Sequence, residues 1–249
     1  MALHRSRNEY TSVLKEVAFC KKDVLKNRND ALARLMEVMP IKEMQKEECL
    51  VVAISFGGVP FAHRLAEAIN ARFDFLFTQA IPSPLNPECE IAMISETYDI
   101  VIHEALVQAF NVSLDYIYGE AQRQYEEKIL KNIYKFRKGE TISSLRGRHV
   151  LLVDEGIDSG MTITTSVKTC ITQQAKSVSI AAPVIPYDVV QQLDEITDDV
   201  YCVLKPHYFV DVDTYYDEIE PVEPSVVEQI LSESLFQSQK NQTNTKENV

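Results

Sequence analysis

The sequence predicts an α/β fold, in which a parallel twisted β-sheet is covered by helices on both faces. Two short apolar runs, Leu50–Ile54 and His149–Val153, are each followed by a glycine-containing turn and then by residues of helical spacing. This order of strand, turn and helix begins a βαβ unit, and its repetition along the chain favours parallel strands. Because ligands of such sheets bind at the carboxyl ends of the strands, we expect both turns at the functional edge.

The composition is that of an ordinary globular protein, with 45% hydrophobic and 25% charged residues in a chain of 249. One large α/β domain fits this length. The net charge of -12 argues against nucleic acid and membranes as partners, because an acidic surface repels nucleic acid and anionic lipid. The five scattered cysteines and the polar start Met1–Tyr10 predict a cytoplasmic protein without disulfides or a secretion signal.

Residues 1–48 are expected to form an N-terminal helical segment packed on the domain. Asn8–Met39 reads as two helices, because apolar residues recur there at helical spacing between Lys and Glu. After the first strand, an amphipathic helix is predicted to extend to about Ala71, and Phe73–Thr78 to form the second strand.

The middle of the chain is less regular. Gln79–Glu96 contains three prolines and little periodicity, which predicts a long loop or flap, with a strand near Ile91–Ile94 as an alternative. A strand is expected at Asp99–His103. Ser113–Lys138 predicts one long polar helix that Asn111 or Ser113 caps and that ends at Gly139.

Regular alternation then returns up to the end of the domain, which we place at residues 49–231. The predicted elements are the helix Met161–Gln174, the strand Ser177–Ala182, the helix Asp188–Ile196 and the strand Val200–Leu204. Residues 232–249 are mostly Ser, Gln, Asn, Thr and Lys, and this polar tail is expected to be disordered.

The most informative segment is Val150–Thr162, in which a buried strand ends at two adjacent carboxylates, Asp154 and Glu155. A turn with two glycines follows and leads into a helix, whose first N–H groups form a natural phosphate site. Carboxylates cannot bind the same phosphate, but they suit hydroxyl groups or a metal that bridges hydroxyls. A phosphate at one end and a diol at the other describe ribose 5-phosphate. Helix capping alone would explain Asp158 or Ser159, but not the two acids after four apolar residues.

This run resembles the phosphoribosyl-diphosphate signature of type I phosphoribosyltransferases. Three weaker pieces, Ser55–Pro60, Asn86–Glu88 and Tyr215–Glu218, are similar to the stand-alone predicted phosphoribosyltransferases of bacteria. The resemblance implies that a nitrogen nucleophile displaces pyrophosphate from C1 of phosphoribosyl diphosphate, with Mg²⁺ as cofactor. A phosphoribosyltransferase-like fold and a phosphoribosyl diphosphate or nucleotide ligand are therefore expected, and a homodimer is left open.

The resemblance also implies roles for individual residues. Asp154 and Glu155 would bind the ribose hydroxyls and Mg²⁺, and Asp158 would be the general base, with a helix cap as the alternative. The remaining positions are the phosphate-binding Asp158, Ser159, Gly160, Met161 and Thr162, the pyrophosphate loop Ser55, Phe56, Gly57 and Gly58, and Phe209 or Tyr208 as the residue that stacks on the base.

The sequence departs from the family in its basic residues. Phe56 stands where the pyrophosphate loop usually carries a basic side chain, and no Lys or Arg occurs between Arg72 and Arg123. Mg²⁺, backbone amides, His63, Arg64 or a partner subunit could supply the charge that a leaving pyrophosphate needs. Two hypotheses follow: a phosphoribosyltransferase, or a protein of the same fold that binds phosphoribosyl diphosphate or a nucleotide for regulation.

Overall fold

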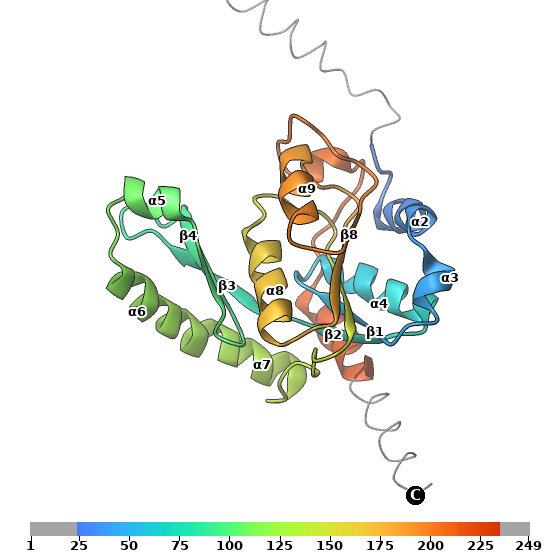
Figure 1. Cartoon of the computed structure of the whole chain (residues 1–249), viewed down its shortest axis with the longest axis horizontal. Coiled ribbons are helices and arrows are strands. Elements are labelled where there is room, and N and C mark those ends of the chain that lie inside the picture. The colour runs from blue at the N-terminus through green and yellow to red at the C-terminus, as the bar shows by residue number, and fades with distance from the viewer. Residues whose placement is uncertain (1–23, 235–249) are drawn as a thin grey trace, which may run out of the picture.

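The computed structural model describes residues 24–234, and Figure 1 shows a parallel sheet with helices around it beside a smaller lobe. The parallel sheet has five strands in the order β2-β1-β6-β7-β8. These are β1 (Cys49–Ala53), β2 (Arg72–Phe75), β6 (His149–Val153), β7 (Ser177–Ala181) and β8 (Asp199–Tyr201). Every neighbouring pair in this sheet is parallel, which confirms the predicted architecture.

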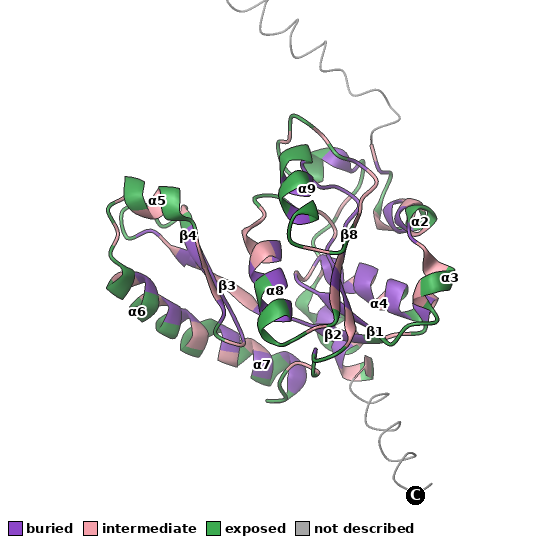
Figure 2. Cartoon of the chain, in the orientation of Figure 1, coloured by how far each residue is buried: buried purple, intermediate pink, exposed green. Residues whose placement is uncertain are grey.

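The central strands are buried on both faces, as helices on either side require (Figure 2). Val51 and Ala53 of β1 belong to the core that α2 (Arg28–Val38) and α4 (Gly58–Ile69) cover. Leu50 and Val52 point to the other core, which α8 (Met161–Thr172) and α9 (Tyr187–Asp194) cover. The helices α8 and α9 thus lie within two residues of their predicted bounds.

The smaller lobe corrects the prediction for the stretch that begins at Phe73. The expected strand Phe73–Thr78 is divided, because β2 ends at Phe75 and β3 (Thr78–Pro82) belongs to a second sheet. The expected loop Gln79–Glu96 is largely a hairpin of β3 and β4 (Glu90–Ser95), and β5 (Ile100–Ile102) completes an antiparallel sheet. Burial on both faces of β4 removes the alternation of apolar and polar residues that would have indicated a strand.

A long helical run packs on this second sheet (Figure 1). After the short α5 (Glu104–Ala109), it consists of α6 (Leu114–Gln124), a π-helical turn (Tyr125–Ile129) and α7 (Leu130–Arg137). Of the two predicted caps, Ser113 is the one used, since its hydroxyl accepts a hydrogen bond from the Tyr116 N–H. The run ends where Lys138 and Gly139 take positive φ angles of 55° and 91°.

The beginning of the described chain lies beside residues 215–217. The Leu25 N–H donates to the Tyr215 carbonyl (2.9 Å), and the Asp217 N–H donates to the Leu25 carbonyl (2.8 Å). Leu25 is completely buried, so this segment closes the same core as α4. Of the two helices predicted in Asn8–Met39, the second is α2, and the first lies outside the described residues. A short α3 (Ile41–Met44) was not predicted.

The C-terminal part of the described chain also differs from the prediction. A helix spans residues 224–234 and buries Val227 and Leu231 in the first core. Residues 232–234, which were predicted to belong to the disordered tail, are therefore helical. Residues 235–249 lie outside the described part. No helix among residues 24–234 combines the length and the apolar character that a membrane span needs.

Candidate functional site

The two glycine-containing loops meet at one edge of the parallel sheet. The chain leaves β1 for β2 on one side and returns through the smaller lobe to β6 on the other, so β1 and β6 are neighbours at the switch point of the sheet. Their carboxyl ends therefore place the loops after Ala53 and after Val153 side by side. The Ile54 N–H still donates to the Val153 carbonyl (3.2 Å), which extends the ladder into the loops.

A hydrogen-bonded chain ties the two loops together. The Ser55 hydroxyl donates to Asp154 Oδ1, and the Gly58 N–H donates to Ser55 Oγ (2.9 Å). Asp154 is only 8% exposed. Burial, which disfavours the charged form, raises the pKa of Asp154 to about 7, and the neighbouring Glu155 charge adds to this rise. Asp154 thus joins the two loops through Ser55, and its burial favours the neutral form of its carboxyl group.

The adjacent glycines of the first loop allow this close approach. A Cβ atom on Gly57 would lie 1.9 Å from Glu155 Oε1. A Cβ atom on Gly58 would lie 2.8 Å from the Val153 carbonyl oxygen and 2.9 Å from the Asp154 Cα. The second loop therefore packs directly on the first, and side chains at these two positions would separate them.

Glu155 has a partner that sequence reasoning missed. Arg28, in the first turn of α2, donates to Glu155 Oε2 through Nε (3.1 Å) and Nη2 (2.6 Å), while its Nη1 donates to the Glu220 carbonyl. Both side chains are partly buried, at 23% and 24% exposure. In the chain without ligand the Glu155 carboxylate is ion-paired with Arg28, and its role in binding ribose hydroxyls stays a prediction. With 127 positions between the partners, no local sequence signal could have indicated the pair.

The second loop leads into the amino end of α8. Ile157 is buried and its N–H donates to the Val184 carbonyl (2.9 Å), whereas Asp158 and Ser159 are exposed. Gly160, with a φ angle of 79°, is the N-cap residue, and no side chain caps the helix there. The alternative role of Asp158 as a cap is therefore wrong. The first N–H groups of α8 keep the arrangement that binds anions.

The segment 208–216 lies against the second loop. The Tyr216 hydroxyl donates to the Glu155 carbonyl (2.7 Å), and a Cβ atom on Gly156 would lie 2.5 Å from Val212 Cγ1. Of the two candidates for base stacking, Tyr208 is 84% exposed. Phe209 is partly buried and stacks on Tyr215, with ring centroids 5.6 Å apart and 10° between the ring planes.

The Phe56 side chain packs against other aromatic rings. Its ring lies 5.2 Å from the Phe136 ring and 5.6 Å from the Phe75 ring, at the border of the first core. His63, which was considered as a source of charge, lies edge-on against Phe73 at 6.0 Å. Phe56 therefore brings no positive charge to the first loop, and the contribution expected from His63 and Arg64 stays a prediction.

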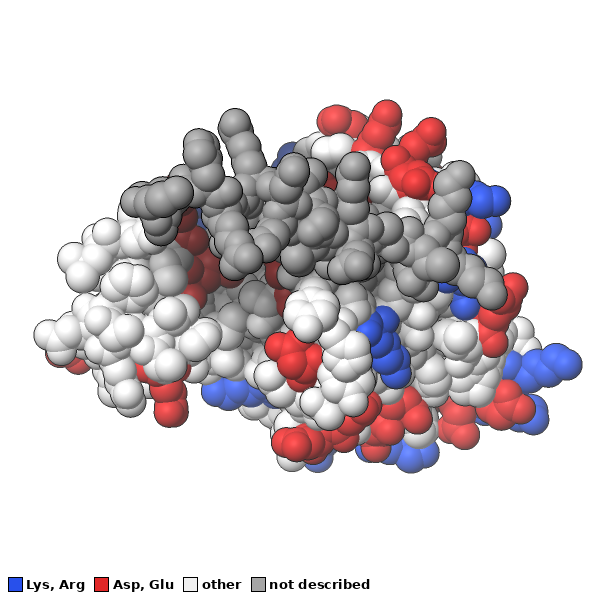
Figure 3. Space-filling view, turned by 90° about the horizontal axis from the view of Figure 1, so that it is seen from above, with Lys and Arg blue, Asp and Glu red and all other residues white. Residues whose placement is uncertain are grey.

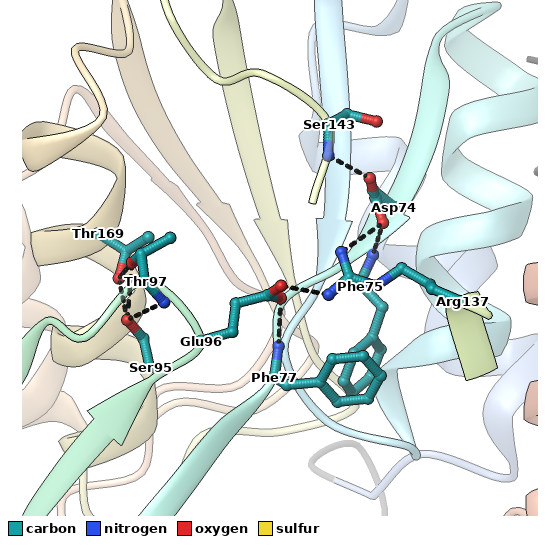
Figure 4. Close-up of polar contacts among 9 residues, drawn as sticks. All are labelled: Asp74, Phe75, Phe77, Ser95, Glu96, Thr97, Arg137, Ser143 and Thr169. Atoms are coloured by element: carbon teal, nitrogen blue, oxygen red, sulfur yellow. Dashed lines mark hydrogen bonds and ion pairs between the residues drawn. The ribbon is translucent and has the colours of Figure 1, made fainter. Parts of the chain in front are cut away.

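A buried ionic network lies beneath this aromatic cluster (Figure 4). Arg137, at the end of α7, is 1% exposed and contacts Glu96, and its Nη1 lies 3.7 Å from Asp74 Oδ1. Its guanidinium carbon lies 5.0 Å from the centroid of the Phe77 ring, and the Phe77 N–H donates to Glu96 Oε1 (3.0 Å). Burial raises the pKa of Glu96, and the Arg137 charge opposes this rise. This arginine therefore holds the smaller lobe to the parallel sheet.

The implied Mg²⁺ would have to be held at the acidic pair Asp154 and Glu155. Among residues 24–234, no group of three or more His, Cys, Asp or Glu side chains could hold a metal ion. Magnesium sites in phosphate-binding proteins commonly use one or two carboxylates and take further oxygens from the ligand and water. Asp154 and Glu155 fit a site of that kind, in which the ligand supplies the remaining oxygens.

Charge is distributed unevenly over the surface. In the view from above in Figure 3, acidic and basic side chains are both spread over the part of the molecule that holds the parallel sheet, and the far end of the smaller lobe shows few charged side chains. The low charge of that end reflects the absence of Lys and Arg between Arg72 and Arg123. An anionic ligand therefore depends on local groups in the loops and on α2.

The order of the sheet and the two facing loops define an α/β protein of the phosphoribosyltransferase type. Residues 23–219 match the family described as the phosphoribosyl transferase domain, and the chain belongs to that family. Curated proteins from two strains of Mycobacterium tuberculosis, each named "Putative phosphoribosyl transferase", are 26% identical over 190 residues. The match covers 76% of this chain but 42% of each relative, so the chain spans less than half of their length.

A solved structure shows the same fold. The protein TT1426 from Thermus thermophilus superposes with a TM-score of 0.69 and 24% identity, over 84% of this chain and 98% of that protein. At this identity the likeness concerns the fold alone. It includes the smaller lobe as well as the parallel sheet, because the two together are needed to reach that coverage.

Proposed function

We propose that the chain transfers a phosphoribosyl group from phosphoribosyl diphosphate to a nitrogenous, base-like acceptor and releases pyrophosphate. The observation that carries this proposal is the junction of the two loops, in which the Ser55–Asp154 hydrogen bond sets the acidic pair beside the glycine loop. Membership in the phosphoribosyl transferase domain family supports the same reaction.

Each part of the junction has a role in this proposal. The N–H groups at the start of α8 and the hydroxyls of Ser159 and Thr162 bind the 5-phosphate, because a helix amino end attracts anions. Asp154 and Glu155 bind the ribose hydroxyls and would hold Mg²⁺ together with ligand oxygens. When bound, that ion would neutralise charge on the pyrophosphate. Ser55–Gly58 presents backbone N–H groups to the pyrophosphate.

The transfer step needs a nucleophile and a base. The acceptor nitrogen attacks C1 of the ribose with its lone pair, and the C1–O bond breaks so that its electron pair leaves with the pyrophosphate. The proton lost by the nitrogen passes to Asp158, whose exposed carboxylate lies at the entrance of α8. Tyr208 or Phe209 stacks on the acceptor, since the segment that carries them adjoins the second loop.

A second candidate function is regulatory binding without catalysis. The ion pair between Glu155 and Arg28 and the burial of Asp154 favour it, because both acids are engaged in the free chain. Ligand binding must then displace Arg28 from Glu155, which links occupancy of the loops to the N-terminal segment.

Release of pyrophosphate separates the two functions. The protein is incubated with phosphoribosyl diphosphate, Mg²⁺ and a panel of purine, pyrimidine and other nitrogenous bases, and pyrophosphate is measured over time. We expect release with at least one base, and its loss in Asp158→Asn. Saturable binding of phosphoribosyl diphosphate without release on any base contradicts the enzyme and supports the regulatory protein.

A further inference from the structure

We propose that Arg28 is the cation of a pyrophosphate-binding site, and that its guanidinium moves from Glu155 to the pyrophosphate when phosphoribosyl diphosphate binds. This inference rests on the proposed function and adds to it a residue of the N-terminal segment, which neither the family match nor the loop motifs assign.

A leaving pyrophosphate carries several negative charges, and stabilising developing charge is usually the largest catalytic contribution. The first loop has no basic residue, and Phe56 is packed against other rings. Arg137 is 1% exposed and held by Glu96, so it cannot serve a ligand. In the described part of the chain, the ion pair that joins an arginine or lysine to Glu155 is that of Arg28.

The position of Glu155 brings Arg28 close to the pyrophosphate loop. One carboxylate oxygen, Oε1, lies 1.9 Å from the Cβ position of Gly57, so it rests on that loop. The other oxygen, Oε2, accepts both hydrogen bonds from Arg28. A single carboxylate therefore separates the guanidinium from the backbone that would present N–H groups to the pyrophosphate.

The side chain of Arg28 has room to move, while its backbone is fixed. It borders an open cleft of about 440 Å³, lined by Asn27, Arg28, Asn29, Glu218, Ile219 and Glu220. Leu25 is completely buried, and the Asn27 side chain caps α2 by accepting from the N–H groups of Asn29 and Asp30. Rotation about the Arg28 side-chain bonds, which also breaks the Nη1 hydrogen bond to the Glu220 carbonyl, is therefore the movement that the exchange requires.

The exchange follows from the charges of the two partners. Glu155 offers one negative charge, whereas a pyrophosphoryl group offers more and accepts a fork of two N–H donors equally well. As Glu155 turns to the ribose hydroxyls and the metal, Arg28 loses its partner and gains the phosphate oxygens. When the C1–O bond breaks, Arg28 donates hydrogen bonds to the pyrophosphate that keeps the electron pair, and no proton is transferred.

The test measures the binding of the two halves of phosphoribosyl diphosphate separately. Calorimetry measures the affinities for inorganic pyrophosphate and for ribose 5-phosphate, each with Mg²⁺, in the unmodified chain and in Arg28→Gln. We expect pyrophosphate affinity to fall at least tenfold in the variant and ribose 5-phosphate affinity to stay within about twofold. Arg34→Gln is the control, because Arg34 lies on the same helix and pairs with Asp30 instead.

The converse variant tests the exchange itself. Measured without Mg²⁺, which Glu155 would otherwise help to hold, Glu155→Gln removes only the charge that competes for Arg28, so pyrophosphate affinity should be unchanged or higher while ribose 5-phosphate affinity falls. If Arg28→Gln does not fold, Glu155→Gln still tests the inference. A loss of pyrophosphate affinity in Glu155→Gln, again measured without Mg²⁺, contradicts it.

Four other results separate the inference from the proposed function. Unchanged pyrophosphate affinity in Arg28→Gln overturns the inference, and so does an equal loss for both ligands, which would mean that Arg28 only positions Glu155. If the unmodified chain binds ribose 5-phosphate but not pyrophosphate, this inference alone fails. If it does not bind ribose 5-phosphate, the proposed function fails.

Discussion

At the scale of single residues, Gly57 and Gly58 of the first loop differ in what surrounds them: a side chain lies against Gly57, and backbone atoms lie against Gly58. The Cβ position of Gly57 meets the end of the Glu155 side chain, which can move. The Cβ position of Gly58 meets the backbone of Val153 and Asp154, which cannot move without opening the sheet edge. The same chemical substitution is therefore expected to have different consequences at the two positions.

Gly58→Ala should lower the free energy of unfolding by about 1–3 kcal/mol, because the added methyl group overpacks a backbone contact. Gly57→Ala should cost less than about 1 kcal/mol but weaken the binding of ribose 5-phosphate, because the Glu155 carboxylate is displaced. Urea unfolding and calorimetry measure the two effects. Equal losses of stability in both variants would contradict this assignment.

Thr162 lies in the first turn of α8, where its hydroxyl can add to the phosphate site. Thr162→Ala should weaken ribose 5-phosphate binding by about 1 kcal/mol or more, roughly fivefold, as expected for a lost hydrogen bond to a charged group. Thr164→Ala is the matched control, because two residues further along a helix the side chain points to the opposite side. Equal effects in a calorimetric titration would speak against a phosphate site here.

At the scale of elements, the buried network of Arg137, Glu96 and Asp74 joins three parts of the fold. Asp74 belongs to β2, Glu96 follows β4, and Arg137 ends α7. The Ser143 N–H also donates to Asp74 Oδ2 (2.7 Å), which fixes the return of the chain toward β6. The smaller lobe is thus attached to the parallel sheet by charge as well as by packing.

Arg137→Met should lower the free energy of unfolding by about 3–5 kcal/mol, because it leaves two buried carboxylates without their cation. Arg123→Gln is the control, since Arg123 is exposed on α6 and its ion pairs with Glu120 and Glu127 contribute at most about 1 kcal/mol. Urea unfolding of both variants measures the difference. Similar midpoints would mean that the network adds little to stability.

The raised pKa of Glu96 makes stability depend on pH. Its pKa is higher in the folded chain than the value of 4.5 expected when unfolded, so folding takes up a proton between the two values. The contribution of the Glu96 carboxyl group to the free energy of unfolding is therefore fully present at low pH and is lost as pH rises through the folded pKa. Arg137, Asp74 and the Phe77 N–H face the carboxyl group, and the arginine and the N–H limit this loss.

In Glu96→Gln, the amide oxygen can still accept the Phe77 hydrogen bond, but the titration is gone. The stability of the unmodified chain relative to this variant should therefore decrease from a pH close to the unfolded value of 4.5 to a pH above the raised folded pKa. Urea midpoints at both pH values provide the measurement, and Glu127→Gln on the exposed helical surface provides the control. If the stability of the unmodified chain relative to Glu96→Gln stays constant or grows with pH, the pKa of Glu96 is not raised.

At the scale of the whole molecule, the two ends of the described chain close one core. Leu25 pairs with Tyr216 as an isolated parallel bridge, and the same core holds Leu35 of α2 and Leu231 of the C-terminal helix. This closure brings Arg28 to the second loop, so the N-terminal segment adjoins the candidate site as well as the core. The division into a segment 1–48 and a domain 49–231 stays a prediction.

Leu25→Ala should lower the free energy of unfolding by about 2–5 kcal/mol, as expected for a large side chain removed from a core. It should also weaken pyrophosphate binding, because the backbone that carries Arg28 loses its anchor. Val38→Ala is a control on the exposed side of α2, where Val38 is 50% exposed. Unfolding midpoints and calorimetry would refute the coupling if Leu25→Ala lost stability without any change in affinity.

Local pattern was enough to predict the parallel sheet, because each of its strands and helices has an apolar face or run of its own. The strand His149–Val153 was predicted with its bounds, and Asp154–Thr162 was singled out because acids rarely follow a buried strand without a reason. The hairpin of β3 and β4 was read as a loop because prolines near its tip and burial on both faces hide the strand pattern.

The partners of the candidate residues depend on contacts between distant parts of the chain, which spacing cannot indicate. Only the folded chain brings Arg28 to Glu155, Ser55 to Asp154 and Arg137 to Glu96. Periodicity reports how one segment divides between core and water, so it could determine which elements form. The electrostatic interactions at the two loops depend on distances in space. Those distances are set by tertiary contacts between segments that are far apart in the sequence, so only the tertiary structure decides them.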